Sequence, residues 1–220
     1  MDPLGVEVKQ SEYLTVENTS EIENIEKRSR FIGRCFPVSS ESEAIALLEN
    51  IRKEDWDATH HCYAYRLKNG AARYSDDGEP SGTAGMPMID VLARGNLCGV
   101  LVVVTRYFGG ILLGTGGLVR AYTKATSDAI RSAGVVRMTP CVCYLVECPY
   151  PAWNSMRLLL DQFGRIDETD FAEIVRCNVW IKEEQTHSFF HSVTERFEGR
   201  IAPQEQKRAF FPFPVTEVEQ

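Results

Sequence analysis

The middle of the chain constrains the fold most, because an apolar run there leads into a glycine-rich turn and then a helical pattern. Val100–Val104 is aliphatic throughout, and five glycines follow within nine residues, from Gly109 to Gly117. Apolar side chains then recur every three or four positions as far as Ala133, which is the period of an amphipathic helix. A buried strand followed by a long helix that packs on it predicts a domain of layered helices and sheet.

Length and composition exclude several classes of protein. A chain of 220 residues with 44% hydrophobic and 25% charged residues can bury one large core or two small ones, and it is too apolar to be disordered. Its longest aliphatic run, Val100–Val104, is far short of the roughly 20 residues of a membrane span. No basic stretch precedes an apolar one at Met1, and the seven cysteines are an odd number. Both features favour a cytoplasmic protein with reduced thiols and no membrane contact.

Two domains are expected. The first, residues 1–137, contains a strand at 29–38, a helix at 41–54 that starts with the capping box Ser40–Glu43, and a strand at 60–67. A loop centred on 75–85, a helix ending near 94, a strand at 99–107 and a helix reaching about 132 complete it.

The second expected domain, residues 138–220, follows a short connection between Gly134 and Pro140. Its pattern predicts strands at 141–148, 165–169, 172–182 and 207–213, with helices at 151–163 and 186–198. The order β-α-β-β-α-β predicts a ferredoxin-like domain, so the overall class is α+β.

Charge is unevenly distributed along the chain. The formal net charge is −7, yet residues 27–140 carry +4 between acidic flanks of −6 (1–26) and −5 (141–220). A basic middle domain suits an anionic partner if its charges share one face, whereas solvated charges scattered over the surface would need no partner.

The glycine-rich turn is the first candidate site. A strand end, a glycine turn and a helix N-terminus can hold an anion, because free backbone N–H groups and the helix dipole face the ligand. The sequence lacks the Lys of a P-loop and the third glycine of a dinucleotide fingerprint. Tight packing of the turn is the alternative role of these glycines. The expected anion or nucleic-acid contacts are Arg73, Arg106, Gly109, Gly110, Gly114, Thr115, Gly116, Gly117, Arg120 and Lys124, with Tyr74, Tyr107 and Phe108 as stacking candidates.

The loop SDDGEPSGTAG is the second candidate site. Asp76, Asp77 and Glu79, together with His60 or His61, could act as an acid or base or hold Mg²⁺. A rigid surface turn is the alternative, with its acids used in capping and bending. His60 and His61 are expected on opposite faces of a strand, so they cannot share one metal ion. No metal site or cofactor is predicted.

Three segments, HHCYAYRL (60–67), RYSDDGEPSGTAGMP (73–87) and RYFGGILLGTGGLVRAY (106–122), resemble the YigZ/IMPACT family. The resemblance covers about residues 20–135. It implies an N-terminal domain similar to the second domain of a small-subunit ribosomal protein and to a domain of elongation factor G. It also implies a ferredoxin-like C-terminal domain of the bacterial type. Eukaryotic members carry a leading domain and restrain an initiation-factor kinase, a role that this chain is not expected to share.

Two functions follow as hypotheses. The first is a translation-associated regulatory protein whose basic domain binds RNA, the ribosome or another phosphate-bearing partner, including a protein partner in translation control. The second is a small-molecule enzyme, metal-assisted or not, at the carboxylate loop. The absence of a complete catalytic motif favours the first, and convergence of the carboxylates in one pocket would favour the second.

Overall fold

The apolar strand at the centre of the sequence is also the centre of a sheet. In the computed structural model, which describes residues 11–215, β6 (Val100–Tyr107) lies between β3 (Ser29–Pro37) and β4 (His60–Arg66). The antiparallel sheet has the order β2-β3-β6-β4-β5 and is completed by β2 (Ser20–Glu26) and β5 (Ala72–Ser75).

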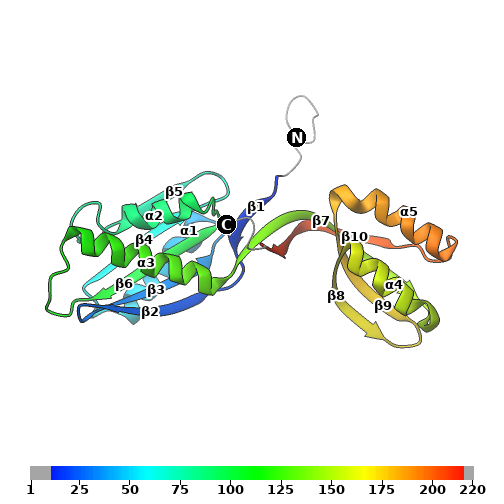
Figure 1. Cartoon of the computed structure of the whole chain (residues 1–220), viewed down its shortest axis with the longest axis horizontal. Helices are drawn as coiled ribbons and strands as arrows, with labels where there is room; N and C mark the ends of the chain where they lie inside the picture. Colours follow the sequence, from blue (N-terminus) through cyan, green and yellow to red (C-terminus); the bar gives the residue numbers. More distant parts are fainter. Residues whose placement is uncertain (1–10, 216–220) are drawn as a thin grey trace, which may run out of the picture. The chain divides into compact units, whose positions relative to one another are not determined.

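Helices cover both faces of this sheet (Figure 1). On one face α2 (Gly85–Arg94) and α3 (Thr115–Ala133) pack against Val100, Val102 and Val104, and on the other α1 (Glu41–Glu54) packs near Leu101 and Val103. Burial on both faces is why the strand is apolar at every position instead of at alternate ones. Helix α3 lies so close to β3 that a Cβ on Gly33 would come within 2.7 Å of the Ala125 carbonyl oxygen.

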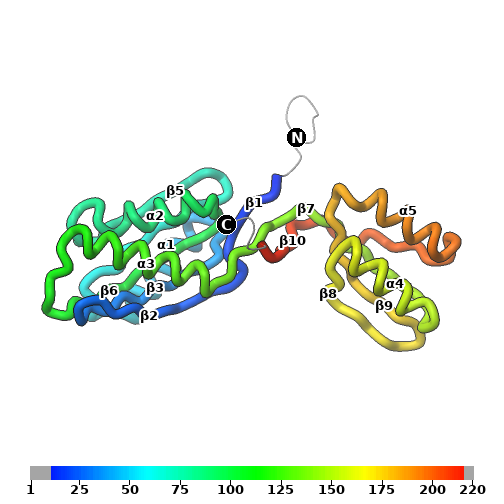
Figure 2. The backbone as a smooth tube through the Cα atoms, in the orientation of Figure 1, coloured from blue at the N-terminus to red at the C-terminus, as the bar shows by residue number. Residues whose placement is uncertain are grey.

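A second compact unit comprises Met138–Phe213, and the first comprises Tyr13–Arg137 (Figure 2). The second unit contains most of β7 (Val135–Cys148), then α4 (Tyr150–Phe163), β8 (Gly164–Phe171) and β9 (Val175–Lys182). It continues with the short helix η1 (Glu183–Gln185), α5 (Thr186–Phe197) and β10 (Gln204–Pro214). The strand order is β10-β7-β9-β8, and the short β1 (Tyr13–Val16) also pairs with β7. Helices α4 and α5 pack on one face of this sheet, around Val146, Val179 and Ile181.

Three expectations need correction. The segment from Gly134 to Pro140 is not a free connection, because β7 begins at Val135 and runs through it. Strands β1, β2 and β5 were not expected. The first domain was expected to start at residue 1; among the described residues the first unit starts at Tyr13, because Glu12 groups with the second unit and accepts a 2.7 Å hydrogen bond from Thr139, and residues 1–10 lie outside the described part. None of the described helices is long and apolar enough to cross a membrane.

The seven cysteines are free thiols, six of them buried and Cys98 partly so. Burial raises the pKa of Cys35, Cys141 and Cys177 to about 12, which leaves almost no reactive thiolate at neutral pH. We therefore expect Ellman's reagent to titrate at most one thiol in the native protein and all seven in guanidinium chloride. Rapid reaction of several thiols without denaturant would contradict the burial of these side chains.

Candidate functional site

The carboxylate loop joins β5 to α2, and its first acid is used in capping. Asp76 accepts hydrogen bonds from the backbone N–H groups of Ala84 (3.0 Å), Gly85 (2.8 Å) and Gly82 (2.9 Å). These donors lie at the start of α2, where no residue of the helix supplies a side-chain cap. Asp76 therefore satisfies N–H groups that the helix itself cannot pair.

The second acid points to the opposite face of the sheet. Asp77 accepts a 2.7 Å hydrogen bond from the backbone N–H of His61 and pairs at 3.0 Å with Arg52 of α1. The His61 ring lies on the same side, with Nδ1 4.0 Å from the Asp77 carboxylate. His60 contacts Glu79 on the α3 side, so the expectation that the two histidines face opposite ways is confirmed.

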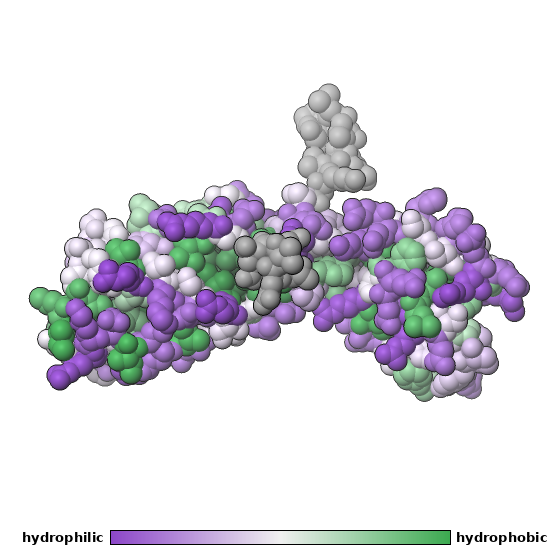
Figure 3. Space-filling view, viewed as in Figure 1, coloured by the Kyte–Doolittle hydropathy of each residue, from purple (hydrophilic) through white to green (hydrophobic). Residues whose placement is uncertain are grey.

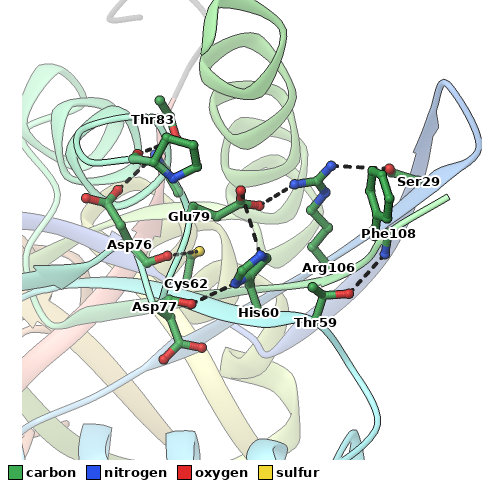
Figure 4. Close-up of polar contacts among 12 residues, drawn as sticks. Ser29, Thr59, His60, Cys62, Asp76, Asp77, Glu79, Thr83, Arg106 and Phe108 are labelled. Carbon is green, nitrogen blue, oxygen red and sulfur yellow. Dashed lines mark hydrogen bonds and ion pairs between the residues drawn. The ribbon is translucent and has the colours of Figure 1, made fainter. Parts of the chain in front are cut away.

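Glu79, the third acid, is buried in the core beneath α3 (Figure 4). It pairs with Arg106 at 2.6 Å and accepts a 2.7 Å hydrogen bond from the hydroxyl of Tyr122, whose pKa burial raises strongly. His60 Nε2 lies 3.9 Å from the other Glu79 oxygen. His60 Nδ1 lies 2.8 Å from the carbonyl oxygen of Asp77, which can only accept, so Nδ1 carries a proton and donates it.

The three carboxylates thus diverge instead of meeting in one pocket. Each one is occupied by backbone donors, by an arginine or by both. Within residues 11–215, no group of three His, Cys, Asp or Glu side chains is placed to hold a metal ion. The condition set for the enzyme hypothesis, convergence of these acids, is not met.

The capping role of Asp76 leads to a first test. Asp76→Ala removes the acceptor for three N–H groups at the start of α2, and we expect it to lower the free energy of unfolding by about 1–2 kcal/mol. Urea denaturation followed by circular dichroism measures this loss. A variant as stable as the wild type would show that water replaces the cap without cost.

A pocket of about 440 Å³ lies between this buried cluster and the turn before α3. Its wall includes His60, Glu79, Arg106, Phe108 and Thr115. Arg106 was expected to contact an anion directly, but only 5% of it is exposed. Its guanidinium is paired with Glu79, and its second terminal nitrogen lies 3.4 Å from the Ser29 hydroxyl. Its charge is therefore neutralised by Glu79 within the fold. Arg106 forms part of the pocket wall and does not offer a free charge to an anion.

The N-terminus of α3 has no side-chain cap, because its N-cap is Gly114 with φ of 73°. The Arg120 guanidinium lies along this first turn, 3.6 Å from where a Cβ on Gly116 would sit. Arg120 is exposed and makes no ion pair with any residue of the described range 11–215. Gly114, Thr115 and Arg120 therefore present N–H groups and a positive charge together.

Lys124 and Arg73, two other residues expected to contact an anion, are not part of this group at the start of α3. Lys124 forms an ion pair with Asp128 and a 2.7 Å hydrogen bond with Asn24, so its charge is shared with an acid. Arg73 pairs with Glu41 at 3.5 Å and lies opposite Tyr65, which is itself opposite Leu101. Leu101 is five residues from Arg106 along β6, or about 17 Å, so Arg73 is remote from the glycine turn.

The sequence reading missed the β2–β3 hairpin, whose tip packs on the glycine turn. A Cβ on Gly109 would lie 2.1 Å from the backbone carbonyl of Arg28, so only glycine permits this approach. The two turn residues, Lys27 and Arg28, both have positive φ, 44° and 66°. Neither forms an ion pair with another described residue, whereas Arg30 and Arg34 in the same hairpin both pair with glutamates.

We call this region the glycine-turn surface; it comprises Lys27, Arg28, Phe108, residues 109–117 and Arg120. Hydrophobic residues are also exposed here: Phe108 is 46% and Leu112 is 83% exposed. Figure 3 shows hydrophobic patches directly beside hydrophilic residues at this end of the first unit, on the left of the view. The surface therefore combines unpaired cations, free N–H groups and an exposed aromatic ring.

Comparison with known proteins identifies relatives over most of the chain. Residues 27–130 match the Impact N-terminal domain. IMPACT family member YvyE of Bacillus subtilis is 35% identical over 212 residues, covering 94% of this chain and 97% of that protein. IMPACT family member YigZ of Escherichia coli is 36% identical over 180 residues, covering 80% and 88%.

A solved structure described as the crystal structure of a hypothetical protein is 32% identical, with a TM-score of 0.57. It covers 90% of this chain, and this chain covers 98% of it. Protein IMPACT of Bos taurus is 30% identical over 125 residues, which is 49% of this chain and 39% of that protein. With a mixed α/β structure and relatives of this identity along nearly its whole length, the chain belongs to the IMPACT family.

Proposed function

We propose that this protein is a translation-associated binding protein whose glycine-turn surface contacts the phosphates of RNA. The observation that carries this proposal is the β2–β3 turn. A two-residue turn with positive φ at both positions favours Asn-Gly, whereas here both positions hold long cationic side chains. Left-handed backbone costs a non-glycine residue free energy, so two strained cations at an exposed tip point to a function for their charge.

The neighbouring groups support the same ligand. Arg120 and the uncapped N-terminus of α3 add positive charge beside the hairpin tip, and Phe108 offers a ring on which a base can stack. A ligand with phosphate groups and bases, such as RNA, fits all of these groups. The link to translation, in a cytoplasmic setting, rests on membership of the IMPACT family, whose eukaryotic members the resemblance connects with translation control; their restraint of a kinase is not part of this proposal.

We infer in addition that the second unit is a ferredoxin-like domain. The order β7-α4-β8-β9-α5-β10 and the strand order β10-β7-β9-β8, with both helices on one face, support this inference.

Co-sedimentation with purified bacterial ribosomes and fluorescence anisotropy with a labelled RNA stem-loop, both at graded salt, test the proposal. Arg120→Glu is expected to weaken binding and to flatten the slope of log affinity against log salt by about 0.7–0.9 for each lost phosphate contact. Arg131→Glu is the matched control, since Arg131 lies on the same helix but pairs with Asp128 at 3.0 Å. Equal affinities and slopes for Arg120→Glu and wild type would contradict the proposed surface.

A further inference from the structure

The second unit has an aromatic sheet face that none of its described helices covers. Helices α4 and α5 pack on the opposite face, against Val142, Val179 and Ile181. Because side chains of a strand alternate, the neighbouring positions point the other way. There, Trp180 of β9 and Phe211 and Phe213 of β10 pack over Cys141 and Cys143 of β7. We call this group the aromatic sheet face.

The three rings form a continuous platform. Trp180 and Phe211 are stacked, with centroids 4.8 Å apart and an interplanar angle of 24°. Phe213 meets Phe211 edge to face at 5.8 Å. Trp180 donates a hydrogen bond from Nε1 to Asp167 at 3.3 Å, which fixes the orientation of the indole. Trp180 is 5% exposed, whereas the two phenylalanines are only partly buried, so they form the accessible part of the platform.

A cation lies over each of these rings. The Lys207 ammonium is 5.2 Å from the centroid of Trp180, the Lys182 ammonium is 5.2 Å from that of Phe213, and the Arg165 guanidinium is 5.8 Å from that of Phe211. The three come from three different strands, β10, β9 and β8. They therefore surround the platform instead of following one strand.

These cations differ from four of the five other arginines of the unit; the fifth, Arg196, donates to the carbonyl oxygen of Ser155. Arg157, Arg176, Arg200 and Arg208 each lie within 4.0 Å of a carboxylate. Within the described residues 11–215, Arg165, Lys182 and Lys207 have no carboxylate partner. Three acids lie near this group: Asp167 is bound to the indole N–H, whereas Glu12 and Glu183 lie near Cys141, where Glu12 accepts from Thr139 and Glu183 pairs with Arg208. Although residues 141–220 carry a net charge of −5, the aromatic sheet face itself is positively charged.

We propose that the aromatic sheet face binds single-stranded RNA, with bases on Phe211 and Phe213 and phosphates at Arg165, Lys182 and Lys207. Stacking of a base on an aromatic ring contributes more than an exposed cation–π contact, so a base can displace a flexible cation from a ring. The displaced ammonium or guanidinium then has a phosphate oxygen within reach. An apolar protein partner would instead bury three cations without counter-charges, which is unfavourable.

This inference stands apart from the glycine-turn surface, because it concerns different residues in the other unit and a different part of the RNA. The glycine-turn surface is expected to contact phosphates, so its affinity for RNA should depend mainly on salt concentration. The aromatic sheet face requires unpaired bases and should reject a duplex, whose bases are already stacked on one another.

Anisotropy of a fluorescein-labelled uridine decamer with the full-length protein tests the inference, and the same decamer paired with an adenosine decamer is the duplex control. The double variant Phe211→Leu, Phe213→Leu keeps both positions apolar but removes both rings. We expect this variant to bind the single strand at least tenfold more weakly and the duplex unchanged. Phe171→Leu is the matched control, since Phe171 is a 57% exposed ring of the same unit outside the platform. Circular dichroism verifies that each variant is folded.

A second measurement uses Trp180 as the probe. With Trp56 and Trp153 replaced by Phe, Trp180 is the remaining indole of the chain, and the decamer should change its fluorescence. Equal decamer affinity in the wild type and the double leucine variant would overturn the inference. So would a failure of the wild type to bind the decamer at any salt concentration, which would direct attention to a protein partner. If only Arg120→Glu weakens RNA binding, the proposed function stands and this inference fails; if only the leucine variant does, the reverse holds.

Discussion

Replacing Lys27 with Asn and Arg28 with Gly should make the protein more stable and at the same time weaken its binding to RNA. Both residues have left-handed backbone, with φ of 44° and 66°. That conformation costs a residue with an ordinary side chain about 1–2 kcal/mol, and Asn-Gly adopts it readily. We expect the free energy of unfolding to rise by about 1–3 kcal/mol in total. Loss of two phosphate contacts should flatten the salt slope by about 1.4–1.8.

Opposite changes in stability and binding distinguish this prediction from a general effect on folding. Glu198→Asn is the matched control, since Glu198 has φ of 54° at the end of α5 in the second unit and is not part of the glycine-turn surface. It should stabilise the protein without weakening RNA binding. Thermal unfolding and anisotropy against salt give the two readouts. A hairpin variant that gains stability but keeps the wild-type salt slope would show that the cations do not contact phosphate.

Glu79→Gln is expected to destabilise the protein by about 3–5 kcal/mol, because it leaves the guanidinium of Arg106 without its counter-charge. Both side chains are almost fully buried, with 2% and 6% of their surfaces exposed, and their 2.6 Å contact lies beneath α3. Tyr122 donates to the same carboxylate, so the substitution also weakens that hydrogen bond. Urea denaturation measures the loss.

Two comparisons show whether the cost comes from the uncompensated charge. Adding Arg106→Met to Glu79→Gln removes that charge and should recover part of the lost stability. Glu23→Gln breaks the exposed pair with Arg30, which lies at 2.8 Å, and should leave stability nearly unchanged. Equal losses for Glu79→Gln and Glu23→Gln would mean that water compensates Arg106 within the pocket.

Much of the fold could be predicted from local pattern. The helix at 41–54 has the expected bounds, and Ser40 accepts a hydrogen bond from the N–H of Glu43 as the capping box predicts. The expected strands at 29–38, 60–67 and 99–107 differ from the observed ones by one residue at an end. The spacing of apolar residues predicted these elements because each strand or helix buries one or both of its faces in the hydrophobic core.

The β2–β3 hairpin was not predicted, and its chemistry explains why. Turn residues of the usual kind would have marked it, but Lys27 and Arg28 occupy the turn. Strand β2 is mostly exposed, so it lacks the apolar alternation of a buried strand. Its extended conformation comes from antiparallel pairing with β3. That pairing depends on residues of another strand, so the local sequence of β2 does not predict it.

The sequence by itself determined the two sets of helices and strands, the family and the positions of the glycine turn and the acids. Only the tertiary structure decided which side chains meet. Asp76, Asp77 and Glu79 are close together in sequence, yet they face a helix end, an arginine of α1 and the buried core. Lys27 and Arg28 are more than 80 residues from Gly109, yet the two turns are in contact. The spacing of apolar residues shows which side of one segment is buried. A site depends on how segments far apart in the sequence pack together, and this packing is determined by the whole core.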